Sequence, residues 1–114
     1  MMKTENDFTT EGLTAKQKKI AKVITKLIKQ KSGGREPSGG GCKAFYTPKE
    51  WKERGEEYGT TSELILVHDG GDMAPYCNWD YCSYEMVEAL SDVLRAEGYF
   101  VEQCTSWYSA VYEV

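Results

Sequence analysis

Apolar residues recur at steps of three and four in two segments, which is the period of an amphipathic helix. The capping box Thr14 to Gln17 and the residues that follow predict a first helix ending near Lys31. A second helix is predicted to begin after an N-cap at Ser83 or Asp80 and to end at Gly98. The first stripe comprises Ile20, Val23, Ile24, Leu27 and Ile28, and the second Met86, Val87, Leu90, Val93 and Leu94. A third, shorter helix of about three turns is predicted from Thr47-Pro48-Lys49-Glu50, which combines an N-cap threonine, a proline and a capping-box glutamate.

Strand-like segments alternate with these helices. The continuous apolar run 64–67 (LILV) is typical of a central strand covered on both faces. Residues 43–46 predict a weak strand, and residues 99–105 and 108–114 predict two β-rich segments, paired as a hairpin or bent at a bulge. The order of elements predicts an α/β (α+β) fold, with a small mixed sheet of three to four strands packed against two to three helices.

Three parts of different composition follow one another along the chain. Residues 1–31 are read as a mobile leader plus a basic amphipathic helix, residues 32–41 (SGGREPSGGG) as a glycine-rich linker, and residues 42–114 as a compact acidic domain. The linker leaves open whether the helix docks on its own domain, on a second copy or on a partner. The helix itself is interpreted mainly as core-facing, with solvated lysines; the alternative is a contact with nucleic acid or an acidic partner.

The charge is unevenly distributed within a net charge of −4. Residues 1–31 carry eight lysines against three acids, residues 32–59 are neutral, and residues 60–114 carry ten acids against one arginine. An acidic body repels nucleic acid and anionic membranes, so direct nucleic-acid binding is expected, if at all, through residues 14–31. A basic protein is the expected partner. With no signal-like or membrane-length apolar run, the predicted location is cytoplasmic, and the four cysteines are read as reduced.

The segment VHDGGDMAPYCNWDY holds the candidate chemistry. His68, Asp69 and Asp72 directly follow the predicted central strand, and ligand sites in open α/β sheets gather beyond the carboxyl ends of strands. Two carboxylates can share Mg²⁺, with His68 as general base, which makes a small metal-dependent hydrolase one alternative. The favoured interpretation is a turn, because glycines supply positive φ and aspartates bind nearby amides.

Cysteine chemistry and phosphate binding have weaker support. His68, Cys77, Cys82 and Cys104 offer four potential zinc ligands, but their spacing is not that of a zinc knuckle. A nucleophilic cysteine would need His68 as its base. There is no phosphate loop and no nucleophile elbow. We therefore predict no cofactor and no metal.

Aromatic residues are more numerous than so small a core is expected to hide. The cluster comprises Tyr76, Trp79, Tyr81, Tyr84, Trp107, Tyr108 and Tyr112. Tyrosine and tryptophan are typical anchors of protein interfaces. The sequence therefore predicts an acidic aromatic surface that binds a basic protein and is built from Asp69, Asp72, Tyr76, Trp79, Asp80 and Tyr81.

Three segments, FYTPKEWKERGEEYG, VHDGGDMAPYCNWDY and VEQCTSWYSAVY, resemble small proteins carried by bacteriophages and prophages. The resemblance covers residues 42–114, implies a mobile-element origin and assigns no catalytic residue. Small acidic phage proteins often inhibit host defence systems, including CRISPR nucleases, by occupying surfaces that evolved for nucleic acid. The leading expectation is thus a non-enzymatic phage-type accessory protein that acts by binding another protein, and inhibition of a host defence nuclease is one form that this action could take. The alternatives are the hydrolase and a structural or assembly component that forms a homo-oligomer.

Overall fold

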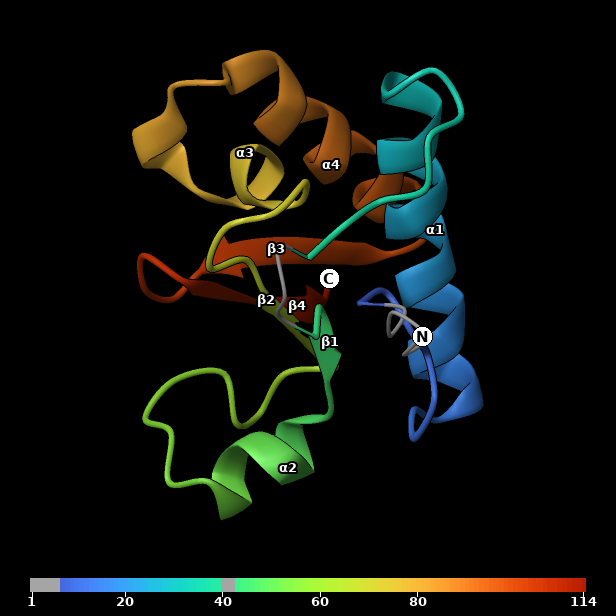
Figure 1. The fold of residues 1–114 in the computed structure, drawn as a ribbon. Helices are drawn as coiled ribbons and strands as arrows, with labels where there is room; N and C mark the ends of the chain where they lie inside the picture. The colour runs from blue at the N-terminus through green and yellow to red at the C-terminus, as the bar shows by residue number, and fades with distance from the viewer. Residues whose placement is uncertain (1–6, 40–42) are drawn as a thin grey trace, which may run out of the picture.

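The centre of the fold is a four-stranded sheet with the strand order β1-β2-β4-β3 (Figure 1) in a computed structural model that describes residues 7–39 and 43–114. The strands are β1 (Phe45–Tyr46), β2 (Leu64–Val67), β3 (Tyr99–Gln103) and β4 (Tyr108–Glu113). The predicted α+β fold is confirmed. Where a mixed sheet was expected, all three pairings among these strands are antiparallel. The short loop of residues 104–107 joins β3 to β4 as a hairpin, and parallel strands would need a much longer crossover.

Strand β2 is the central strand that its continuous apolar run predicts. It pairs with β1 on one side and β4 on the other, and all four of its residues are buried. Alternate side chains enter different cores. Leu64 and Leu66 pack into the larger core, whereas Ile65 and Val67 pack into a smaller one on the opposite face.

Two long helices, α1 (Ala15–Lys31) and α4 (Tyr84–Ala96), pack on the face of the sheet that holds the larger core (Figure 1). The predicted capping box at the start of α1 is present. The stripe of α1 enters the same core as Leu66 and Leu90, through side chains that include Ile20, Ile24 and Ile28. The lysine helix is therefore part of the body of the protein, and its lysines occupy the outer side. The Nζ atom of one of them, Lys16, lies 2.7 Å from Oε1 of Glu63 and 3.2 Å from Oε1 of Glu113.

The residues that precede α1 are packed rather than mobile, at least from residue 7 onward. Phe8 is buried and meets Phe45 edge to face, with 5.5 Å between ring centroids. The backbone N–H of Ala44 donates to the carbonyl oxygen of Asp7 at 2.7 Å. The leader expected to be mobile over residues 1–12 is therefore packed at Asp7 and Phe8, because Phe8 fills an apolar site beside Phe45. The rest of that leader, residues 1–6, positions 40–41 of the predicted linker, and Cys42 lie outside the described residues.

The short helix α2 (Pro48–Glu53) covers the other face of the sheet. The predicted capping box is present, and Tyr46 and Trp51 flank it with 5.1 Å between their ring centroids. Trp107 and Tyr108 pack on Trp51. Tyr108 is therefore a residue of this smaller core, and Trp107 lies half-buried against it. The helix is shorter than the three turns expected, because the chain leaves it at Arg54 and Gly55, where φ is +84°. None of the helices in the described residues is long and apolar enough to cross a bilayer.

Candidate functional site

His68, the predicted general base, lies in the interior. Its side chain is 2% exposed, and its Nε2 atom is 2.8 Å from the Ser109 hydroxyl oxygen. Burial lowers the pKa of His68 to about 4, and the nearby backbone of His68 and Tyr108 and the charge of Asp69 oppose this shift only in part. At neutral pH the imidazole is therefore uncharged and inaccessible to a substrate.

Ser109 links His68 to a second buried group. Its hydroxyl is also hydrogen-bonded to the thiol of Cys77, which lies in helix α3 (Ala74–Cys77). Burial raises the pKa of Cys77 to about 12, and the bond to Ser109 only partly offsets this. Cys77 is thus a thiol and not a thiolate at neutral pH, which removes its nucleophilicity. The His68, Ser109 and Cys77 side chains form a buried polar chain on the face of the sheet that holds the larger core.

The two aspartates of the HDGGD segment differ in their surroundings. Asp69 is exposed, whereas Asp72 holds the preceding loop in place. The Asp72 carboxylate accepts a hydrogen bond from the Ser38 backbone N–H at 2.8 Å and lies 3.4 Å from the Arg35 guanidinium. In return, the Asp72 N–H donates to the Ser38 carbonyl oxygen at 2.8 Å. The geometry is that of a turn that anchors part of the predicted linker, and His68 and Asp72 face different partners.

The aromatic residues of this region divide between core and surface. Tyr76 is 4% exposed and belongs to the larger core, so it is not available as an interface anchor. Trp79 and Tyr81 are 55% and 51% exposed, and Tyr84 at the start of α4 is 58% exposed. Of the six predicted partner-binding residues, Asp69, Trp79, Asp80 and Tyr81 are exposed.

A short 3₁₀-helix, η1 (Trp79–Tyr81), presents these exposed rings. Its N-terminus is capped by the Asn78 side chain, which accepts from the Asp80 N–H at 2.9 Å. The Gln103 carboxamide of β3 accepts from the Trp79 backbone N–H at 3.1 Å and donates to Asn78. The chain leaves η1 at Cys82 in a left-handed conformation, with φ of 55°. These hydrogen bonds fix the backbone from which the Trp79 indole projects.

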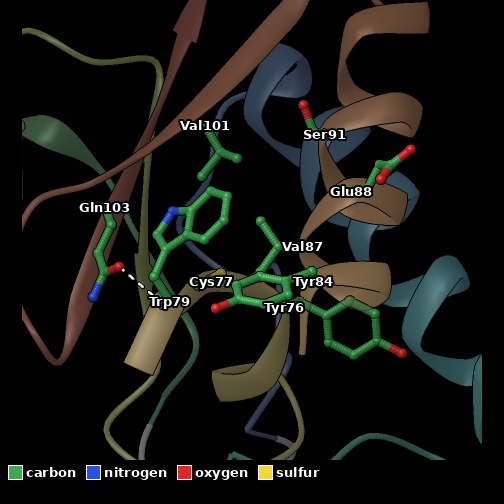
Figure 2. Close-up of a pocket in the computed structure, with 9 residues that line it drawn as sticks. All are labelled: Tyr76, Cys77, Trp79, Tyr84, Val87, Glu88, Ser91, Val101 and Gln103. Carbon is green, nitrogen blue, oxygen red and sulfur yellow. Dashed lines mark hydrogen bonds between the residues drawn. The ribbon is translucent and has the colours of Figure 1, made fainter. Parts of the chain in front are cut away.

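Beside Trp79 lies a pocket of about 330 Å³ between α3, η1, α4 and β3 (Figure 2). This volume falls at the lower end of the range for small-molecule sites. Figure 2 shows the Trp79 indole between Gln103 of β3 and Val87 of α4, with Glu88 and Ser91 projecting from the same helix. The lining residues are Tyr76, Cys77, Trp79, Tyr84, Val87, Glu88, Ser91, Val101 and Gln103. A second, more open hollow of about 450 Å³ shares Trp79, Val101 and Gln103 with it.

The elements around this pocket are strongly acidic. They carry Asp80, Glu85, Glu88, Asp92 and Glu102 against a single base, Arg95. Such a concentration of one charge attracts cations and repels anions. The pocket therefore has apolar walls in an acidic surrounding.

The four candidate zinc ligands do not form one cluster. His68 and Cys77 are buried, Cys82 is exposed, and Cys104 lies near β4 with a pKa that burial and the charge of Glu102 raise to about 11. Within residues 7–39 and 43–114, no group of three or more histidines, cysteines or acids is arranged to hold a metal ion.

Sequence reasoning missed most of the pocket. The three residues Tyr84, Glu88 and Ser91 recur at steps of four and three, so they share one face of α4 beside its apolar stripe. From that stripe of mixed aromatic and polar residues, the side of the pocket formed by α4 could have been predicted. Val101 and Gln103 gave no such signal, because their place beside Trp79 depends on the strand order.

Compared with family models, curated proteins and solved structures, the chain shows no match.

Proposed function

We propose that the chain is a non-enzymatic binding protein that docks on a basic surface of a partner protein. The acidic aromatic surface predicted from the sequence is revised here to the exposed residues of η1 and of the start of α4, and this surface makes the contact. It consists of Trp79, Asp80, Tyr81, Tyr84 and Glu85. The observation that carries the proposal is the exposure of three large aromatic side chains, 51% to 58% each, on adjacent elements. Trp79 and Tyr84 contact each other, with 5.9 Å between ring centroids.

The size of the exposed rings supports a binding role. A buried tryptophan or tyrosine removes about 150–250 Å² from water, so three half-exposed rings leave on the order of 300 Å² of mainly apolar surface uncovered. Patches of that size on a monomer are often functional. Aromatic side chains also contribute much of the binding energy at interfaces, since they lose little rotamer entropy.

The acidic setting favours a partner of opposite charge. A basic protein surface would meet Asp80 and Glu85 on the rim of the aromatic surface, which speeds association and weakens the complex as salt rises. Basic surfaces of this kind are typical of proteins that handle nucleic acid. The resemblance to phage proteins fits an inhibitor that competes with nucleic acid for such a surface.

The hydrolase alternative lacks comparable support. It requires His68 as an accessible base, whereas this side chain is 2% exposed and its pKa is about 4. It also requires Asp72 to be available for a cation, whereas the Asp72 carboxylate already accepts the Ser38 N–H.

The test is affinity capture from bacterial lysate with the tagged protein, washed at low and high salt, with identification by mass spectrometry. Three forms are compared: the unchanged chain, the double variant Trp79→Ala/Tyr81→Ala, and the control Tyr58→Ala, which removes a tyrosine that is 50% exposed outside this surface. We expect a basic protein that is lost at high salt and with the double variant, but kept by the control. Equal capture by all three forms would refute the proposal.

A further inference from the structure

The pocket beside Trp79 opens within the acidic aromatic surface, because Trp79 and Tyr84 belong to both. Its deeper part is formed by buried side chains, among them Cys77 and Val87, which are 4% and 8% exposed. The polar atoms of Gln103 are already engaged with Trp79, Asn78 and Thr105. The ionisable group that distinguishes this lining is the carboxylate of Glu88, an exposed residue of α4.

This combination selects an amphipathic cation. Val87 and Val101 offer apolar wall to an aliphatic stem, the indole of Trp79 offers a π face, and Glu88 offers a carboxylate. A cation over an aromatic face is attracted by the ring quadrupole, and tryptophan is the strongest such partner. An anion would face the acidic surrounding, and a fully apolar group would leave Glu88 without a counter-charge.

Arginine fits these features better than lysine. Its planar guanidinium stacks on aromatic rings, binds carboxylates through two parallel N–H groups, and is more weakly hydrated than an ammonium group. We propose that this pocket receives an arginine side chain of the basic partner, an inference that rests on the proposed function and names the residue that anchors it. The stem lies against Val87 and Val101, and the guanidinium lies against Trp79 with its N–H groups donating to Glu88.

The test uses the full chain and three short peptides, acetyl-Gly-Arg-Gly-amide and its lysine and citrulline analogues. Citrulline keeps the shape of arginine but has no charge. Binding is followed by the NMR shift of the Trp79 indole N–H, identified by its loss in Trp79→Ala, with the buried Trp51 indole as internal reference. We expect saturable shifts at Trp79 that are strongest with arginine, weaker with lysine and absent with citrulline.

Variants of α4 distinguish binding in the pocket from attraction to the overall negative charge of this region. Glu88→Gln removes the carboxylate and should weaken arginine binding about threefold to fivefold, as for an exposed ion pair. The matched control Asp92→Asn removes the same charge from an exposed residue of α4 that does not line the pocket, and should change affinity less than twofold. Ser91→Phe fills the pocket while keeping every acid, and should abolish the shift.

Equal shifts with arginine and citrulline, or equal effects of Glu88→Gln and Asp92→Asn, would overturn the arginine pocket. The proposed function is judged separately by the capture experiment. If Trp79→Ala/Tyr81→Ala loses the partner while Ser91→Phe retains it, the surface binds without the pocket and the arginine inference alone is wrong. If Ser91→Phe and the double variant both lose the partner, both proposals are supported.

Discussion

Burial of His68 makes stability depend on pH in a range where few other side chains titrate. The pKa of His68 is about 4 in the folded protein, and the ordinary value is 6.5. As the pH falls, His68 therefore binds a proton in the unfolded chain before it does so in the folded chain, so acid favours unfolding. The contribution of His68 to the free energy of unfolding is therefore fully present above pH 7 and is lost as the pH drops from 6.5 towards 4.

The size of this effect follows from the two pKa values. Integrating the difference in bound protons gives a loss of about 1.4 kcal/mol by pH 5.5 and about 2 kcal/mol by pH 5, with a limit of roughly 3 kcal/mol below pH 4. Because His68 is the only histidine, and carboxylates titrate mainly below pH 5, the loss down to pH 5.5 belongs almost wholly to this side chain.

The measurement is urea unfolding at half-unit steps from pH 7.5 to 5, followed by circular dichroism. The control is His68→Gln, whose amide can still bond to Ser109 but does not titrate. We expect the free energy of unfolding of the variant to change little from pH 7.5 to 5.5, whereas that of the unchanged chain falls by about 1.4 kcal/mol. Parallel curves for the two proteins would refute the burial argument.

Three further predictions test the turn, the caps and the cysteines. Gly71→Ala should lower the free energy of unfolding, measured with urea, by about 3 kcal/mol, because the new Cβ would lie 2.5 Å from the backbone that Gly71 faces and φ there is +81°. Gly70→Ala should lower it by only about 1 kcal/mol, because φ is +87° but no atom lies within 4 Å of the added Cβ. Equal losses for the two variants would contradict the close approach at Gly71. Thr47→Ala should cost about 1 kcal/mol in the same assay by removing the capping box of α2, and an unchanged midpoint would show that the cap contributes nothing. In maleimide labelling at pH 7 read by peptide mass spectrometry, Cys82 should react within minutes and Cys77 only after unfolding; rapid labelling of Cys77 would contradict its burial.

Local signals in the sequence predict most of the elements correctly. The caps at Thr14 and Thr47 are determined by side chains three residues apart, so a short window of sequence contains the whole interaction. The run Leu64–Val67 likewise reports its burial on both faces directly. The small elements α3 and η1 were missed, because each has at most four residues and neither has a periodic pattern.

The candidate site was less predictable, because burial at its residues depends on distant partners. His68 follows a strand in a position that often serves function, yet Ser109 of β4, 41 residues away in sequence, turns it into a core residue. Asp72 is likewise engaged by Ser38, from a segment that composition alone describes as a flexible linker. A role for Trp79 at the surface was predicted from its residue type. The pocket beside it could not be predicted in that way, because it forms only where β3 lies beside η1.

The position of β4 determines when the protein can fold during synthesis. This strand is made after β1, β2 and β3, yet it lies between β2 and β3 and is the neighbour that joins them. A nascent chain that has reached residue 103 contains β2 and β3 but not the strand that pairs with both of them, so neither strand has this sheet neighbour. The sheet closes only when residues 108–113 have left the ribosome, so the acidic aromatic surface, which depends on β3 for its Trp79 anchor, becomes competent to bind only after that strand is in place.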